Sequence, residues 1–204
     1  GVCGDQVRQG YLLMDELLRN GHRRIGYVSH YRSREVVHFE FQENHYSVVE
    51  RAEAYLEFCR ERELMPLLPG LDSDHNAAET VDGALAQGAT AFVTYAFTDA
   101  LRVEYLLRKR GLRVPEDVSI IGDTGIASGA HFNPPLTSVA HDTEGTARAI
   151  GEGLRELFDG GSFGIRIVRS YLLERQSVYN ITQKQQGGVP EQVVTVSSKE
   201  RKGK

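Results

Sequence analysis

Polar and aromatic side chains that could hold a small ligand follow two predicted buried strands. Asp123 comes after the apolar run 118–121, and a carboxylate there can accept paired hydrogen bonds from neighbouring hydroxyl groups. Tyr95 and Phe97 come at the end of an earlier strand, where either ring could stack on the apolar face of a sugar. In open α/β sheets ligands lie beyond the carboxyl ends of the strands, so these residues are candidates for one site. A simple turn-forming role for Asp123 is an equally open alternative.

Arg51 is the candidate cation, and it lies in a helix predicted over residues 48–63. The planar guanidinium fork donates several hydrogen bonds in a fixed geometry, which suits recognition of hydroxyl groups or a carboxylate. The alternative is a solvated arginine at the start of the helix, paired with Glu50 or Glu53.

The sequence gives little support for enzyme or metal chemistry. It contains no nucleophile elbow (a G-x-S-x-G turn that leads from a strand into a helix), no phosphate loop and no dinucleotide fingerprint. The triplet at 123–125 is like that of aspartic proteases, but those enzymes need two such loops in a β-rich fold. His30, His38 and His45 are seven or eight residues apart, which matches no compact metal-ligand motif. We therefore expect no enzyme activity, no metal site and no cofactor.

Two other histidines have structural interpretations. His22 follows the end of a predicted helix, where the helix dipole favours a positive charge. His141 lies near Pro134 and is expected in a turn.

Strands and helices alternate along the chain, and these elements must position the candidate residues. Gly111 can take the left-handed turn that ends a helix, Pro115 prevents the helix from continuing, and Gly122 is expected to end the strand at a tight turn. Residues 36–41 could form an edge strand or a loop. The spacing suits βαβ units and predicts an α/β fold with a doubly wound, mostly parallel sheet. The predicted strands are 24–29, 89–95, 118–121 and 165–173, with a weaker one at 64–68, and the predicted helices are 7–20, 48–63, 76–87, 98–110 and 143–158.

Composition and charge fit one globular domain followed by a tail. The chain has 204 residues, 40% hydrophobic and 25% charged, and its net charge of -4 does not indicate a basic nucleic-acid surface. No apolar run approaches a membrane-spanning length. Cys3 and Cys59 are expected to be reduced thiols. We predict a ligand-binding domain over 1–181 and a disordered polar and basic tail over 182–204.

Five short motifs occur in an order that is typical of one family. They are Leu17-Leu-Arg-Asn-Gly-His-Arg-Arg-Ile25, Glu50-Arg51, the stretch from Gly111 to Gly122, Pro134-Pro-Leu-Thr137, and Leu172-Leu-Glu-Arg-Gln-Ser-Val178. Over about residues 2–178 the chain resembles the effector-binding domain of lactose-repressor/galactose-repressor (LacI/GalR) type transcription regulators. That domain shares its fold with periplasmic sugar-binding proteins.

The resemblance implies a periplasmic-binding-protein-like (type I) fold, of which this chain would hold the second lobe and a remnant of the first. The helix at 143–158 would belong to that remnant, and Gly1-Val-Cys-Gly4 looks like the end of a strand, as expected of an N-terminally truncated chain. The implied function is to sense a small sugar-like metabolite and to signal by lobe closure in a cytoplasmic homodimer. Contact with DNA would be made only through a head domain absent from this chain. The alternatives are an exported sugar-binding protein of a transport system and a degenerate interaction module that binds no ligand.

The resemblance also bears on the candidate site. Arg51 matches the arginine with which the family holds its ligand. Alignment from Pro134 places Thr124, rather than Asp123, at the usual acidic position, and Ala96-Phe97 fall where relatives often carry asparagine and aspartate. These departures support the degenerate module. The predicted ligand-binding residues are Arg51, Tyr95, Phe97, Asp123 and Thr124.

Overall fold

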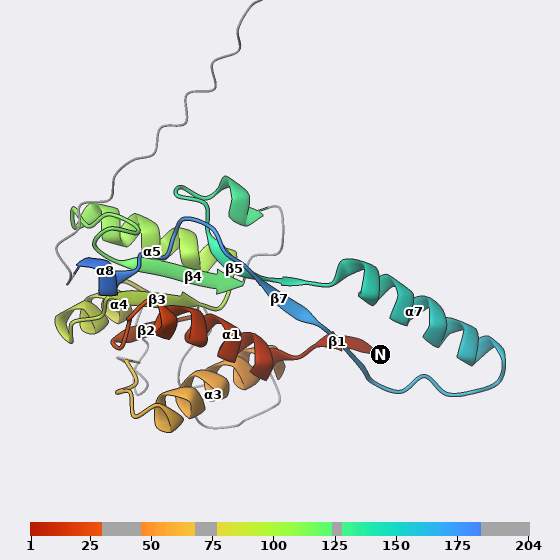
Figure 1. Ribbon diagram of the computed structural model, residues 1–204. Coiled ribbons are helices and arrows are strands. Elements are labelled where there is room, and N and C mark those ends of the chain that lie inside the picture. The colour runs from red at the N-terminus through yellow and green to blue at the C-terminus, as the bar shows by residue number, and fades with distance from the viewer. Residues whose placement is uncertain (30–45, 68–76, 124–127, 185–204) are drawn as a thin grey trace, which may run out of the picture.

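The computed structural model describes residues 1–29, 46–67, 77–123 and 128–184. These residues form a layered α/β body, here called the main body. A smaller part, here called the outer unit, extends to one side of it (Figure 1). Both parts matter for the site, because the candidate residues lie near the place where the chain passes from one part to the other.

The main body is built on a five-stranded sheet. The strand order is β2-β3-β4-β5-β7, in which the first four strands are parallel and β7 is antiparallel to β5. The predicted α/β class with a mostly parallel sheet is therefore confirmed. The strands are β2 (Ile25–Val28), β3 (Ala91–Thr94), β4 (Ser119–Asp123), β5 (Thr137–His141) and β7 (Ser170–Leu173).

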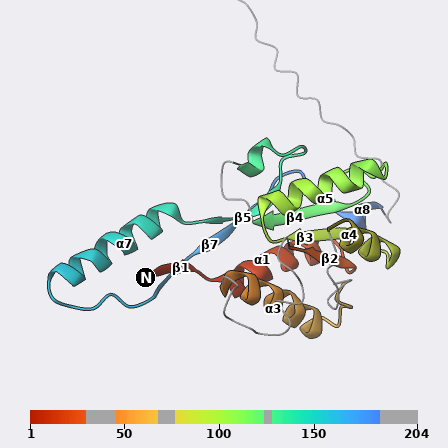
Figure 2. The ribbon, with the colours of Figure 1, turned by 180° about the vertical axis from the view of Figure 1, so that it is seen from behind.

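Helices cover both faces of this sheet, as Figure 1 and the reverse view in Figure 2 show. One hydrophobic layer combines α1 (Gln6–Arg19) and α3 (Tyr46–Glu61) with strand residues such as Tyr27 and Val93. The other combines α4 (Ala77–Ala86) and α5 (Phe97–Lys109) with Phe92 and Ile120. Successive strand residues point to opposite faces, so strands covered on both faces are apolar throughout.

Local signals explain where the helices begin and end. The carboxylate of Asp5 accepts a hydrogen bond of 2.8 Å from the backbone N–H of Arg8 and caps α1. The helix α5 ends just before Gly111, whose φ of 73° is the left-handed conformation predicted from the sequence. Asp142 caps α7 (Thr143–Phe158) by accepting from the N–H of Gly145 at 2.8 Å.

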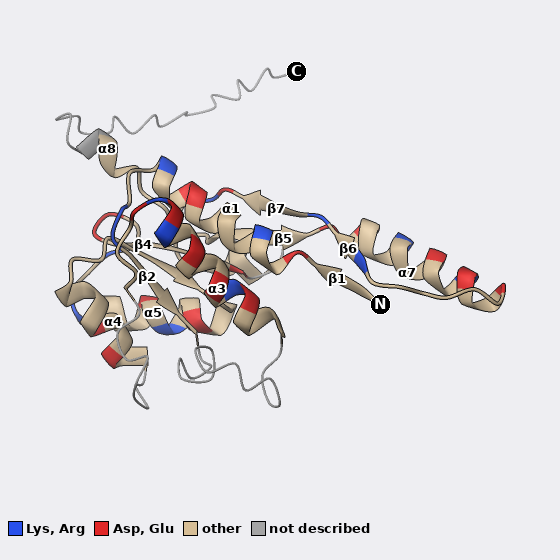
Figure 3. Cartoon of the chain, turned by 90° about the horizontal axis from the view of Figure 1, so that it is seen from below, with Lys and Arg blue, Asp and Glu red and all other residues tan. Residues whose placement is uncertain are grey.

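The outer unit consists of α7 and a two-stranded parallel sheet of β1 (Val2–Gly4) and β6 (Arg166–Val168). Figure 3 shows acidic and basic residues interspersed along α7, and Arg166 bonds Glu152 and Glu156. On this helix Ile150, Leu154, Leu157 and Phe158 are 42–88% exposed. The predicted helix over 143–158 thus lies in the outer unit, together with β1 and β6.

Three connections join the two parts within the described residues. They lead from β1 to α1, from β5 to α7, and from β6 to β7, and are here called the crossovers. The sequence predicted one strand over 165–173, which is wrong: Arg169 separates β6 from β7, and the two strands belong to different sheets. The strand β5 was not predicted at all.

Smaller differences concern single elements. Gly122 lies inside β4 and does not end it; a Cβ at this position would overlap the side chain of Thr94. The weak strand 64–68 is reduced to one bridge between Leu67 and Gly26. The short helix α8 (Ile181–Lys184) crosses the predicted start of the tail, and residues 185–204 and 36–41 lie outside the described residues.

The interpretation of His22 as a cation at a helix end is also wrong. The residue is 1% exposed and lies between Thr90 and the backbone of Tyr179. Burial lowers the pKa of His22 from 6.5 to about 4, although the hydrogen bond to the Tyr179 carbonyl acts in the opposite direction. The imidazole is therefore neutral at pH 7.

Candidate functional site

Three of the predicted site residues meet at the carboxyl ends of the parallel strands. Arg51, 7% exposed, donates from Nη2 to Oδ2 of Asp123 at 2.5 Å and from Nη1 to the carbonyl of Tyr95 at 2.9 Å. Its Nε donates to Oε1 of Gln6 at 2.7 Å. The guanidinium carbon also lies 4.8 Å from the centroid of the Tyr95 ring. The alternative in which Arg51 pairs with Glu50 or Glu53 in solvent is therefore wrong.

The elements around Arg51 hold it in this position. Tyr95 directly follows β3, and its hydroxyl group lies 2.8 Å from Oγ of Ser47 in the first turn of α3. Gln6 begins α1, so that helix supplies the acceptor for Nε. The arginine is thus fixed by α1, by α3 and by the ends of two strands, which is a preorganised arrangement for binding.

Asp123 is the last residue of β4, and its carboxylate is shared by two partners. Besides Arg51, Nε2 of His141 lies 3.6 Å from Oδ2. Burial raises the pKa of Asp123, but the hydrogen bond from His141 and the positive charge of Arg51 outweigh it, so the pKa is lowered below its ordinary value. The carboxylate is therefore ionised at neutral pH, and Asp123 is no simple turn residue.

Phe97 is not part of this arrangement. The ring of Phe97 packs against Phe132 with centroids 6.2 Å apart and contributes to the hydrophobic layer under α5. Phe97 therefore has a packing role in the described structure. Thr124 lies outside the described residues, as do His30, His38 and His45. Among the residues that the structure describes, no three His, Cys, Asp or Glu side chains come together as a metal site would require.

Sequence reasoning missed several polar residues beside Arg51 and Asp123. Gln6, Gln9, Ser170 and His141 all lie close to the crossovers. His141, expected in a turn, ends β5 and contacts Asp123. The only available signal was position, because Gln6, His141 and Ser170 stand at element ends and Gln9 lies in the first turn of α1.

Pockets flank the crossovers. One of about 670 Å³ lies on the α3 side of β1, and another of about 310 Å³ lies on the side of His141 and α7. The larger one is lined by residues 1–7, Tyr46, Glu50, Ile165 and Ile167, and the smaller one by residues 2–4, His141, Thr143, Thr146 and Val168. Both adjoin the Arg51 arrangement, although Arg51 and Asp123 line neither.

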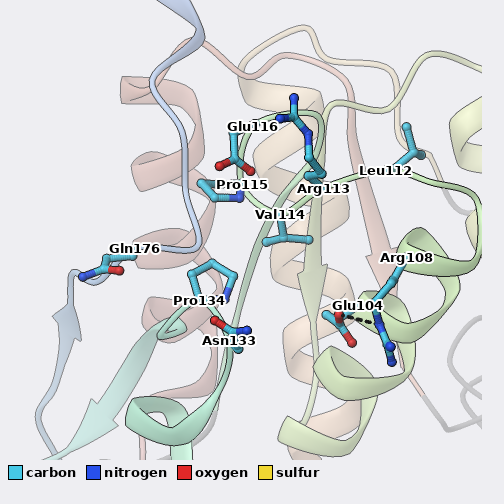
Figure 4. A pocket seen from close by; sticks show the side chains of 10 residues that line it. All are labelled: Glu104, Arg108, Leu112, Arg113, Val114, Pro115, Glu116, Asn133, Pro134 and Gln176. Carbon is cyan, nitrogen blue, oxygen red and sulfur yellow. Dashed lines mark ion pairs between the residues drawn. The ribbon is translucent and has the colours of Figure 1, made fainter. Parts of the chain in front are cut away.

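A further pocket of about 550 Å³ lies at the opposite edge of the sheet, where β4 and β5 begin (Figure 4). Three of its charged side chains are paired: Glu104 with Arg108 at 3.2 Å, and Arg113 with Asp117 at 3.0 Å. Ligands of open α/β sheets lie at the carboxyl ends of the strands, so this pocket is not the candidate site.

Comparisons with known proteins identify the family of this chain. The family model "Periplasmic binding protein-like domain" matches residues 14–178. The HTH-type transcriptional repressor PurR of Aliivibrio salmonicida is 26% identical over 188 residues, which is 88% of this chain and 53% of the relative. PurR of Aliivibrio fischeri (strain MJ11) is 30% identical over 146 residues, which is 68% of this chain and 40% of the relative. The chain thus spans about half the length, or less, of these curated relatives.

Solved structures agree on the fold. A sugar-binding LacI-family regulator of Escherichia coli in complex with phosphate has a TM-score of 0.69 at 24% identity, covering 88% of this chain and 63% of that one. A periplasmic binding protein/LacI regulator of Alkaliphilus metalliredigens in complex with D-xylulofuranose has a TM-score of 0.68 at 21% identity. The match covers 87% of this chain and 65% of that one. A dimeric Lac repressor has a TM-score of 0.68 at 18% identity, covering 88% of this chain and 64% of that one.

The family model covers most of the chain, and both the curated relatives and the solved structures are regulators of one type. The chain belongs to the periplasmic binding protein-like family, in the form of the effector-binding domain of LacI-type transcription regulators, which is not an enzyme.

Proposed function

We propose that this chain binds a small sugar-like effector at the carboxyl edge of its main sheet, with Arg51, Asp123 and Tyr95 as contacts. The observation that carries the proposal is the buried ion pair. Among the described residues, three of the five guanidinium N–H groups of Arg51 serve Gln6, Tyr95 and Asp123, and two remain for a ligand. Both partners of Asp123 within the described part of the chain use Oδ2, so Oδ1 can accept from a hydroxyl group. A polyol offers the matching donors and acceptors.

The arrangement of the two parts supports signalling by closure. An effector that binds more tightly to one orientation of the outer unit would shift the balance between orientations. In the intact regulator that shift would change the fit of DNA-binding heads to their half-sites. DNA would be contacted through a separate head domain, and the regulator would act in the cytoplasm. Relatives described as sugar-binding, or complexed with D-xylulofuranose or cellobiose, favour a carbohydrate effector.

Homodimerisation is part of the proposal. On α5, the side chains of Leu101 and Tyr105 are 45% and 49% exposed and lie one turn apart on the helix. Apolar groups presented together on one helix suit a contact with a second copy. Leu101→Glu should then lower the apparent mass in sedimentation to that of a monomer.

A thermal-shift screen tests ligand binding. Sugars, sugar acids and nucleobases are added to a full-length regulator that contains this domain. A ligand at one hundred times its Kd should raise the Tm by about 5 to 10 °C. Arg51→Met should abolish the shift, whereas Arg110→Met, which removes an arginine paired with Asp82 on the surface, should preserve it. The absence of any shift across the panel would refute the proposal.

One observation favours a second candidate, an interaction module that binds no ligand. Arg51 and Asp123 already form an ion pair with each other, and Phe97 packs against the core instead of the site. In that case no compound changes the Tm, and Arg51→Met alters only stability. An exported sugar-binding protein is less well supported, because the curated relatives are repressors.

A further inference from the structure

Each crossover contributes one polar residue to a cluster at the junction of the two parts. Gln9 follows the first crossover, His141 precedes the second and Ser170 follows the third; together they are here called the crossover cluster. Nε2 of Gln9 donates to Oγ of Ser170 at 2.9 Å and lies 3.4 Å from Nδ1 of His141. Oγ of Ser170 lies 3.4 Å from the same nitrogen.

The cluster depends on a close approach to β1. A Cβ at Gly4 would lie 2.6 Å from Nε2 of Gln9 and 3.3 Å from Nδ1 of His141. Gln9 is 1% exposed, and its Oε1 has no hydrogen-bond partner among the described residues. Burying an amide with one unsatisfied atom destabilises the folded state, so stability alone does not explain a polar side chain at this position.

The cluster also closes a ring with the candidate site. From His141, Nε2 reaches Oδ2 of Asp123 at 3.6 Å, and Asp123 bonds Arg51. Arg51 bonds Gln6, whose Nε2 donates to the carbonyl of Gly4 at 3.3 Å. The ring therefore begins and ends at the crossovers and passes through the ligand-site ion pair.

Donor and acceptor rules determine the state of His141. The amide nitrogen Nε2 of Gln9 can only donate hydrogen bonds. The Ser170 hydroxyl accepts one of these bonds and still has its own hydrogen to donate. When that hydrogen points to the ring, both groups face Nδ1 as donors and Nδ1 is the acceptor. In the neutral ring the proton then sits on Nε2, the nitrogen that faces Asp123.

We propose that Gln9 and Ser170 are positioning residues that fix this tautomer of His141, and that His141 couples the Asp123 carboxylate to all three crossovers. Movement of the outer unit then displaces the imidazole relative to Asp123, and a change at Asp123 is felt at the crossovers. Coupling between two such sites is reciprocal. That Asp123 contacts an effector rests on the proposed function, but the coupling itself does not.

The first test is ¹⁵N NMR of the histidine side chains in the 204-residue chain, at a pH where His141 is neutral. Proton attachment at Nε2 is expected in the wild type. The double variant Gln9→Met/Ser170→Ala removes both donors and should give a mixture of tautomers. A proton on Nδ1 in the wild type would overturn the proposal, and so would an unchanged tautomer in the double variant.

The second test is amide hydrogen exchange at Asp142, whose N–H donates to the carbonyl of Arg169 at 3.1 Å and so joins two crossovers. Asp123→Asn should speed this exchange about fivefold or more. His141→Gln should do the same, and the two changes together should add little. Asp82→Asn, which breaks a surface pair with Arg110, is the matched control and should leave exchange unchanged.

Equal exchange in Asp123→Asn and its control, or fully additive effects in the double variant, would refute the coupling. Neither test uses an effector, so a failed ligand screen and a failed coupling experiment are distinguishable. The tautomer measurement on the wild type stands even if a variant does not fold.

Discussion

The buried His22 should make the stability of this domain fall between pH 6.5 and pH 4. Its ring lies between Oγ1 of Thr90, 2.9 Å from Nδ1, and the carbonyl of Tyr179, 3.0 Å from Nε2. In the neutral ring Nε2–H donates to the carbonyl and Nδ1 accepts from the hydroxyl group. These contacts join the end of α1 to β3 and to the last described segment of the chain.

The magnitude follows from the pKa of His22, which burial lowers from 6.5 in an exposed ring to about 4 in the folded protein. Between these values the unfolded chain binds a proton and the folded chain does not, so the stability is complete above pH 6.5 and declines as the pH falls. One pKa unit corresponds to about 1.4 kcal/mol, which gives a loss of about 3 kcal/mol by pH 4. Below pH 4 both states are protonated and this contribution levels off.

Urea denaturation at a series of pH values measures the effect. The variant His22→Gln keeps a donor for the Tyr179 carbonyl but cannot be protonated, so its free energy of unfolding should be lower at pH 7 and flat between pH 6.5 and 4. His131→Gln, a change at an exposed histidine of the short helix Gly129–His131, should retain the wild-type slope. A wild-type curve that is flat in this window, or a His22→Gln curve that still falls, would refute the reasoning.

Three further predictions concern packing and the ion pair. Gly10→Ala should destabilise the domain by about 1–3 kcal/mol in urea, because the new Cβ would lie 2.8 Å from Cβ of Ala54, and adding Ala54→Gly should restore stability. Phe97→Ala should cost about 2 kcal/mol through loss of the contact with Phe132, while any ligand-induced rise in Tm persists. Arg51→Met should cost about 2–3 kcal/mol at pH 7, since it leaves the Asp123 carboxylate largely buried beside His141 alone. Arg51 helps to lower the pKa of Asp123, so the ionised carboxylate stabilises the fold above pH 4 and this contribution is lost on acidification. In Arg51→Met this loss should be smaller, which is measured as the free energy of unfolding at a series of acidic pH values.

The sequence predicted the elements of the main body well, for reasons that are local. The α3 helix was predicted over 48–63 and spans 46–61, because its apolar residues recur at helical spacing. Gly111 has the left-handed conformation that its place after α5 requires. The break at Arg169 could not be predicted, since strands on both sides of it read as one β-rich run and only the tertiary structure assigns them to different sheets.

For the site, the sequence identified residues attached to element ends but not the contacts between distant segments. Arg51 and Asp123 were identified from a helix start and a strand end, and they meet across 72 positions of the chain. His141 and His22 were misinterpreted because burial, which decides their roles, comes from partners far away in the sequence. Phe97 was expected in the site, but the first turn of α5 turns its ring toward Phe132.

The ion pair and the crossovers share the same residues, and this has a physical consequence. A buried pair such as Arg51 and Asp123 does not stabilise a fold unless further hydrogen bonds satisfy its remaining groups. Here Gln6, which also bonds β1, supplies such a bond to Arg51, and His141, which ends β5, lies 3.6 Å from the Asp123 carboxylate. The pair is thus held by the segments that connect the two parts. An effector that binds Oδ1 of Asp123 or the remaining N–H groups of Arg51 would therefore act directly on the hydrogen bonds and contacts at the crossovers. Signalling to the outer unit would not need an extended series of packed side chains.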